Sequence, residues 1–203
     1  MTRRKPTPLP LIDQPPAERA DAARNRQRLV EAAARIVSAR GVAGLALDEV
    51  AREAGLGVGT AYRRFGDVGA LAYALLEDHE VRFQEAFLTG PPPLGPGAPP
   101  AARIRAFVFA LLELQEEQWD LRLLAVQKAS QGHGSGPYPT YHLHLVRLLE
   151  SLDRDLDAPY LASALLALLQ PNVLDHQHRT LNLSPARVRQ GIESVLDGLI
   201  PAI

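Results

Sequence analysis

The sequence predicts an all-α protein, and three observations support this fold class. Apolar residues recur at intervals of three and four in the segments 161–169 and 188–199, which is the spacing of one helix face. No segment shows the strict alternation of apolar and polar residues that is typical of a half-buried strand. The periodic segments also begin and end at helix signals, such as Ser184-Pro185 before the last one and Gly41 after the first.

The expected helices are separated by residues that helices do not tolerate. Residues 89–100 contain six Pro and three Gly, so they are expected to form an exposed loop, and Pro171 should kink or divide the helix around it. Two short helices are expected within residues 45–65. The longer helices that precede the two periodic segments are expected at 21–40, 67–88, 101–117, 118–130 and 141–155. The prediction is therefore about nine helices.

Residues 45–65, LALDEVAREAGLGVGTAYRRF, carry the clearest functional pattern. An apolar-patterned helix runs into Gly55, a tight turn follows, and a second short helix ends at Phe65-Gly66. Two short helices joined by such a Gly-containing turn form a helix-turn-helix, whose second helix fits the DNA major groove. Its outward polar side chains are expected to meet phosphates and base edges, and they are Thr60, Tyr62, Arg63 and Arg64.

Charge is distributed unevenly along the chain, although the net charge is only −1. Residues 1–70 contain 12 Lys and Arg against 8 Asp and Glu (net +4), whereas residues 71–203 contain 10 against 15 (net −5). This asymmetry indicates one end that faces nucleic acid and another end with a different task. Arg24, Arg26 and Arg28 lie near the start of the first helix and are expected near DNA phosphates.

Several short motifs lie at consistent spacing across the N-terminal part of the chain. They are Ala33, Arg35-Ile36-Val37 and Gly41, then Val50-Ala51-Arg52-Glu53-Ala54-Gly55, then Gly59-Thr60-Ala61-Tyr62-Arg63-Arg64-Phe65, and finally Ala70-Leu71. With these motifs, the region from about Arg19 to Leu71 resembles the DNA-binding domain of the tetracycline-repressor (TetR/AcrR) family of bacterial transcription regulators. The resemblance implies a homodimeric regulator, most often a repressor, that binds a palindromic double-stranded DNA operator and is released by a small-molecule effector.

Two positions depart from the pattern of that family. Ala46 stands where members usually carry Ser or Thr, so the second helix lacks a hydroxyl cap that could form a capping box with Glu49. The loss should cost about 1 kcal/mol of local stability. Val68 stands where Lys or Arg is common, so one ionic contact to the DNA backbone is missing, and Arg63 and Arg64 are the candidates to compensate.

The domain organisation follows from composition and from the resemblance. Residues 1–18 contain five Pro and few apolar residues, which predicts a disordered basic arm. Its Arg3-Arg4-Lys5 run is either a minor-groove contact or part of a floppy tail. Beyond it we expect a three-helix DNA-binding domain at 19–66 and a helical effector-binding and dimerisation domain at 67–203.

The second domain has no signature of its own, so its sites are predicted from residue type. A mostly apolar pocket needs large aromatic and a few polar side chains, and the candidates are Phe83, Phe87, Phe107, Trp119, Gln127, Tyr141, His142 and His176. The last two helices carry more apolar residues than one core needs, so they are expected to pair across a two-fold axis. The predicted dimer-interface residues are Leu161, Leu165, Leu168, Ile192, Val195, Leu196 and Leu199.

Composition limits the other classes of protein. Cysteine is absent, which excludes disulfides and thiol chemistry and fits a reducing cytoplasm. The longest strongly apolar run, 161–169, is too short to span a bilayer, and the N-terminus lacks the apolar core of a signal peptide. We therefore expect a cytoplasmic protein without a membrane partner.

The alternative is a helical enzyme or metal-binding protein whose helix-turn-helix is merely structural. His142 and His144, and likewise His176 and His178, are two residues apart, so on a helix each pair points about 200° apart and cannot chelate. No HExxH, P-loop or nucleophile-elbow motif is present. We therefore expect no metal, no cofactor and no catalytic residues.

Overall fold

The computed structural model describes residues 17–128, 137–152 and 155–200. Within these residues every regular element is helical, which confirms the all-α prediction. The described residues form ten α-helices rather than about nine, because Pro171 begins a short helix of its own. No helix in these ranges is both long and apolar enough to cross a membrane.

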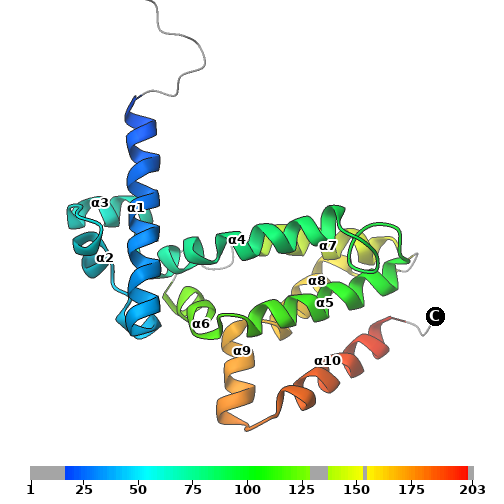
Figure 1. Cartoon of the computed structure of the whole chain (residues 1–203). Coiled ribbons are helices and arrows are strands. Elements are labelled where there is room, and N and C mark those ends of the chain that lie inside the picture. Colours follow the sequence, from blue (N-terminus) through cyan, green and yellow to red (C-terminus); the bar gives the residue numbers. More distant parts are fainter. Residues whose placement is uncertain (1–16, 129–136, 153–154, 201–203) are drawn as a thin grey trace, which may run out of the picture.

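Three helices and a 3-10 turn form a compact N-terminal unit (Figure 1). They are α1 (Ala17–Arg40), η1 (Val42–Gly44), α2 (Leu47–Glu53) and α3 (Val58–Phe65). Their shared core is built from small and branched side chains, and Leu29, Val50, Ala51 and Ala61 are completely buried in it. The small residues let the short helices approach α1 and each other closely, which positions the outer face of α3.

Two helices contribute to more than one core. α4 (Val68–Thr89) places Leu71 in the N-terminal core and Phe87 in the C-terminal core. α6 (Trp119–Lys128) packs along α4, inserts Leu121 into the N-terminal core and packs Trp119 against the C-terminal core. The two cores are joined through these shared helices, and the domain limits expected from the sequence stay predictions.

The remaining helices complete a larger C-terminal bundle. They are α5 (Pro100–Glu116), α7 (Tyr138–Glu150), α8 (Ala158–Leu168), α9 (Pro171–Asp175) and α10 (Pro185–Leu199), with a π-helical turn η3 (His176–Thr180) after α9. α7 packs against α5 and α8, while α9 packs against α6 (Figure 1). α10 covers one side of the bundle through four buried apolar residues, Val188, Ile192, Leu196 and Ile200.

Most of the predicted helix signals operate as expected. Asp67 caps α4 by accepting a hydrogen bond from the main-chain N–H of Ala70 (2.8 Å), and Ser184 caps α10 in the same way from Arg187 (3.3 Å). The Pro- and Gly-rich segment between α4 and α5 is not helical. The prediction for α7 is shifted, because Pro139 lies in its first turn and the helix begins at Tyr138 instead of Tyr141.

Candidate nucleic-acid interface and ligand cavity

The turn between α2 and α3 has the geometry of a helix-turn-helix. Gly55 follows the end of α2 with φ of 64°, a left-handed conformation that glycine adopts without steric cost. The main-chain N–H of Leu56 donates to the carbonyl oxygen of Ala51 (2.9 Å), which closes the end of α2. α3 then buries Ala61 against α2 and half-buries Phe65, so the opposite side of α3 is left outside.

The outer face of α3 carries three of the four side chains predicted to meet DNA. Tyr62 is 49% exposed, and Arg63 and Arg64 are also exposed. Thr60 is half-buried, and its Oγ1 accepts a hydrogen bond from Arg63 Nη2 (3.4 Å). The helix thus presents a phenol and two guanidinium groups outward, the donors that suit phosphates and the acceptor edges of guanine.

Tyr62 is held by a neighbour on the preceding helix. A hydrogen bond to Asp48, followed by the charge of that carboxylate, raises the pKa of Tyr62 above its usual value. Tyr62 therefore keeps its proton at neutral pH and remains a donor. Asp48 lies in the first turn of α2, so this contact links the two helices of the motif on their outer side.

Val58 and Gly59, the first two residues of α3, were not among the DNA-contacting residues predicted from the sequence. Val58 is 43% exposed, and a Cβ added at Gly59 would meet no atom within 4 Å. The start of α3 therefore adds an open apolar and glycine surface to the exposed face of this helix. Its position at the start of the second short helix was the signal that could have identified it.

The three arginines of α1 that were predicted near DNA phosphates are engaged within the chain. Arg28 Nη2 donates to the main-chain carbonyl oxygen of Ala54 (2.7 Å) at the end of α2, in a partly buried position. Arg26 Nη2 pairs with Glu77 Oε2 (2.7 Å) on α4, and Arg24 pairs with Asp21. Arg28 and Arg26 therefore have structural partners, and their role as phosphate contacts stays a prediction.

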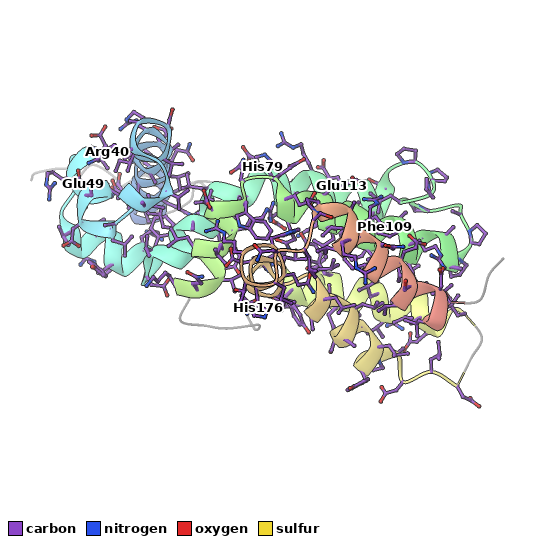
Figure 2. The ribbon with its side chains drawn as sticks, turned by 90° about the horizontal axis from the view of Figure 1, so that it is seen from below. Arg40, Glu49, His79, Phe109, Glu113 and His176 are labelled. Atoms are coloured by element: carbon purple, nitrogen blue, oxygen red, sulfur yellow. The ribbon has the colours of Figure 1, made fainter. Side chains whose placement is uncertain are left out.

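The two departures from the family pattern have visible structural consequences. Ala46 is the N-cap residue of α2 and provides no side-chain cap. Glu49 instead pairs with Arg40 (2.9 Å) and with Arg52 on the exposed side of the unit (Figure 2). These arginines, Arg40 first, lower the pKa of Glu49. Val68 is half-buried against the N-terminal core, so its apolar side chain serves packing.

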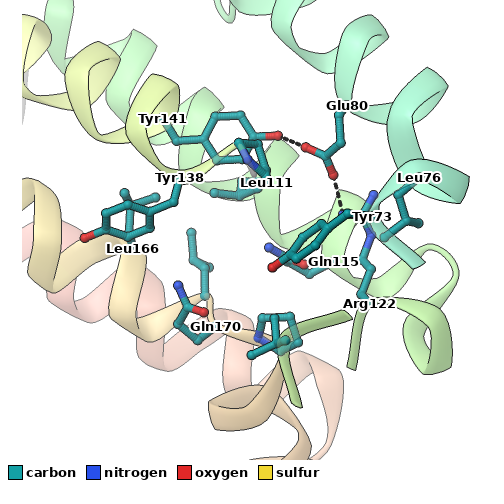
Figure 3. Close-up of a pocket in the computed structure, with 14 residues that line it drawn as sticks. Tyr73, Leu76, Glu80, Leu111, Gln115, Arg122, Tyr138, Tyr141, Leu166 and Gln170 are labelled. Atoms are coloured by element: carbon teal, nitrogen blue, oxygen red, sulfur yellow. Dashed lines mark hydrogen bonds and ion pairs between the residues drawn. The ribbon is translucent and has the colours of Figure 1, made fainter. Parts of the chain in front are cut away.

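The C-terminal bundle contains a cavity of about 130 Å³ among α4 to α9 (Figure 3). Its lining combines apolar side chains with two charged residues and several amide and phenol groups. The lining residues are Tyr73, Leu76, Glu80, Leu111, Gln115, Arg122, Val126, Pro137, Tyr138, Tyr141, Leu166, Leu169, Gln170 and Pro171.

Glu80, Arg122 and Tyr141 form a hydrogen-bonded network in the cavity wall (Figure 3). Arg122 Nη1 donates to Glu80 Oε1 (2.6 Å), and the Tyr141 hydroxyl donates to Glu80 Oε2. Burial, and then the charge of Glu80, raise the pKa of Tyr141 well above its usual range, so it remains a donor. Glu80 and Arg122 are the two buried charged side chains among the described residues, at 8% and 5% exposure.

Of the eight residues predicted for the pocket, Tyr141 lines this cavity. Phe83, Phe87 and Phe107 instead form an aromatic cluster in the core, with ring centroids 5.2–5.3 Å apart. His144 packs against this cluster with its ring tilted to those of Phe87 and Phe107, and burial, followed by the charge of Arg103, lowers its pKa to about 4.

The other predicted pocket residues lie elsewhere. Trp119 contacts His178 in an edge-on arrangement, with ring centroids 5.8 Å apart. His142 Nε2 lies 3.0 Å from Ser163 Oγ. Gln127 and His176 are exposed, and Figure 2 labels His176. The sequence identified residue types that suit a pocket, but it could not place them relative to a cavity formed by six helices.

The predicted dimer residues also divide by burial. Leu165, Ile192 and Leu196 are buried in the bundle core, so they have no free surface for a second copy. Val195 is 45% exposed. Leu161, Leu168 and Leu199 are half-buried. The exposed positions on the same two helices include small or apolar residues, Ala164, Ala167, Gly191, Ser194, Val195 and Gly198, together with Tyr160 and the larger polar residues Arg187, Arg189, Gln190 and Asp197.

Within the described ranges, no group of three or more His, Asp or Glu side chains is arranged to hold a metal ion. The paired histidines on α7 point to different neighbours, because His142 meets Ser163 on α8 whereas His144 meets Phe87 on α4. This divergence is the one expected for residues two apart on a helix.

The N-terminal unit is similar in sequence to known regulators. Residues 29–75 match the family model of the bacterial regulatory proteins, tetR family. An HTH-type transcriptional regulator of Staphylococcus aureus is 39% identical over 59 residues, which cover 29% of this chain and 32% of that protein. This chain thus spans about a third of the length of the curated relatives that it matches.

Solved structures extend the likeness to most of the chain. A TetR-family transcriptional regulator from Pectobacterium atrosepticum has a TM-score of 0.61 and 23% identity, covering 91% of this chain and 98% of that one. BioQ, solved with its natural double-stranded DNA operator, has a TM-score of 0.61 and 21% identity, covering 87% and 98%. A transcriptional regulator from Pseudomonas aeruginosa has a TM-score of 0.54 and 25% identity, covering 92% of both chains. These likenesses show a shared fold across both cores.

Proposed function

Because this chain belongs to the TetR family of bacterial regulatory proteins, we propose that it is a DNA-binding transcription regulator. The observation that carries the proposal is the outer face of α3, where Tyr62, Arg63 and Arg64 are exposed on a helix of helix-turn-helix geometry. The partner is a double-stranded DNA operator, read in the major groove by this helix.

The regulator acts as a homodimer on a palindromic operator. Two-fold symmetry of the protein requires two matching half-sites, spaced so that both α3 helices reach the groove. The exposed small side chains on α8 and α10, including Ala164, Gly191 and Val195, allow close approach of a second copy. Bound across a promoter, such a dimer blocks transcription, so the sign is repression, and the site of action is the cytoplasm.

A small-molecule effector controls operator binding through the cavity. Tyr73 and Glu80 line both the cavity and a neighbouring groove that extends to Arg26, Arg64 and Phe65 next to α3. A ligand that prefers one spacing of α4 and α6 therefore biases the position of α3. A tenfold loss of operator affinity requires about 1.4 kcal/mol of coupling between the two sites.

The test begins with selection of bound sequences from a random duplex pool, followed by fluorescence anisotropy on the selected operator. Arg63→Ala should weaken operator binding by about 1–3 kcal/mol and relax the preference at one base position if Arg63 reads a base. Arg147→Ala, at an exposed position on α7, is the matched control and should bind normally. A pool without enriched sequences, or equal losses on selected and random DNA for every α3 variant, contradicts sequence-specific regulation.

The alternative, an enzyme with a structural helix-turn-helix, gives a different result. Such a protein would bind DNA weakly and without sequence preference, and α3 substitutions would leave its activity unchanged. Nothing in the cavity favours a reaction over binding, because its two buried charges neutralise each other and the phenols of Tyr73 and Tyr141 keep their protons. We therefore propose a regulator and no catalysis.

A further inference from the structure

The cavity wall contains a hydrogen-bond donor that the chain itself does not use. Arg122 is 5% exposed, and two of its nitrogens are occupied, Nη1 by Glu80 (2.6 Å) and Nε by the carbonyl oxygen of Glu117 (3.1 Å). Its Nη2 has no hydrogen-bond partner among the described residues and is inaccessible in the free chain. A buried donor of a charged group is costly to leave unpaired, so this nitrogen favours an acceptor beside it.

We propose that the cavity binds an uncharged, ring-sized organic molecule that carries one hydrogen-bond acceptor, such as an aryl ketone or aldehyde, which docks on Arg122 Nη2. Only the regulatory effect of this ligand rests on the proposed function, because binding of the ligand to the chain is measured without DNA. It names the class of effector, which neither the fold nor the relatives supply.

The size of the cavity sets the size of the ligand. Its volume is about 130 Å³. An apolar cavity of about 150 Å³ in another protein holds benzene, so one ring with a short substituent is the appropriate scale. Leu111, Leu166 and Leu169 supply apolar wall for the ring.

The charges around the cavity select against an ionised ligand. Arg122 and Glu80 form a direct ion pair, so the site already has zero net charge at close range. A carboxylate would bring an extra negative charge next to Glu80 in a buried place, which is strongly unfavourable unless it is neutralised. A carbonyl oxygen accepts the Nη2 hydrogen bond without adding charge.

Three probes of nearly equal size separate these cases by isothermal titration calorimetry on the full chain without DNA. They are acetophenone, benzoate and ethylbenzene, which share a ring and differ in acceptor and charge. We expect acetophenone to bind at least tenfold more tightly than either of the others. Tightest binding of benzoate, equal binding of acetophenone and ethylbenzene, or no binding of acetophenone would each overturn the proposal.

Variants then locate the contact. Arg122→Met combined with Glu80→Gln removes both charges together and keeps an acceptor for the Tyr141 hydroxyl. In this double variant the advantage of acetophenone over ethylbenzene should fall below about twofold, while ethylbenzene binding persists. Arg147→Met, at an exposed position outside the cavity lining, should leave all three affinities unchanged. An undiminished advantage in the double variant would place the contact elsewhere and refute the role of Arg122.

Operator binding is measured separately by anisotropy in the presence and absence of acetophenone. A protein that binds acetophenone as expected but no operator supports the ligand class and contradicts the proposed regulator. A protein that binds an operator but none of the three probes contradicts the ligand class alone. The two failures are therefore distinguishable.

Discussion

The N-terminal unit and the C-terminal bundle use their polar residues in opposite ways. In the N-terminal unit, Tyr62, Arg63 and Arg64 stand on the outside of one short helix, where a local motif in the sequence already identifies them. In the bundle, Glu80 and Arg122 lie 42 positions apart and meet inside a cavity. Local motifs therefore predict a surface that contacts a partner, whereas a buried site depends on how distant helices pack.

The largest expected effect comes from two adjacent residues on α10. Leu196 is completely buried and Val195 is 45% exposed, although the sequence suggested both for the dimer interface. Leu196→Asp buries an unpaired charge and should destabilise the chain by more than about 4 kcal/mol, which abolishes the fold. Val195→Asp should keep the helical circular dichroism spectrum and yield monomers in sedimentation velocity. A folded, monomeric Leu196→Asp protein would show that the interface assignment from periodicity describes this helix better than burial does.

A smaller effect concerns pH and the aromatic cluster. The pKa of His144 is lowered to about 4 in the folded chain from the usual 6.5, so the unfolded chain takes up the proton first as pH falls. The stability that His144 contributes is fully present above pH 6.5 and is lost as pH falls toward 4, by roughly 1–3 kcal/mol.

His144→Leu should remove this part of the pH dependence. Urea unfolding at pH 7.5 and pH 4.5 measures the free energy of unfolding of both proteins, and the wild type should lose more of it than the variant between these pH values. Equal losses in wild type and variant would mean that His144 is solvated in the bundle, contrary to its ring contact with Phe87.

A comparable effect separates two arginines of the N-terminal unit. Arg28→Ala removes a partly buried hydrogen bond to the carbonyl oxygen of Ala54 and should lower the free energy of unfolding by about 1.5–3 kcal/mol. Arg63→Ala, on the exposed face, should leave the melting temperature nearly unchanged and weaken operator binding. If Arg28→Ala kept full stability and lost only DNA affinity, the sequence-based assignment of Arg28 to phosphate contact would be preferred.

The smallest effect tests the missing cap of α2. Ala46 has the extended backbone of an N-cap residue, φ −142° and ψ 143°, and its side chain is exposed. Ala46→Ser should therefore add a hydrogen bond and stabilise the chain by about 0.5–1 kcal/mol, seen as a rise in melting temperature. Ala43→Ser, at an exposed position in η1 that is not a cap, should change it little. No gain at position 46 would indicate that solvent already satisfies the first main-chain N–H groups of this helix.

The fold could be predicted because its signals are local. The caps at Asp67 and Ser184, the stop at Gly41 and the division at Pro171 each act within a few residues, and each operates as expected. The boundaries of α1 and α7 were less accurate, since terminal turns depend on neighbouring contacts.

The sites were predicted unevenly for a physical reason. The α3 face needs only one helix and its period, so Tyr62, Arg63 and Arg64 emerge from the sequence directly. The cavity depends on the relative positions of six helices, which the sequence does not show. Aromatic residues such as Phe87 and Phe107 therefore looked like pocket residues but fill the core. Arg122 could not be selected, because in the sequence it is one arginine among many and only packing buries it.

The sharing of α6 between the two cores bears on how this chain could be recombined with its relatives. Leu121 and Ala125 complete the packing around α1 and α4, although they lie far beyond the helix-turn-helix in sequence. A chimera that joins residues 17–89 to a foreign effector domain would leave that core open unless the new domain supplies an equivalent helix. The unit that can be transferred is thus discontinuous, because it consists of the N-terminal segment together with α6. Such hybrids should retain operator specificity only when both pieces are transferred.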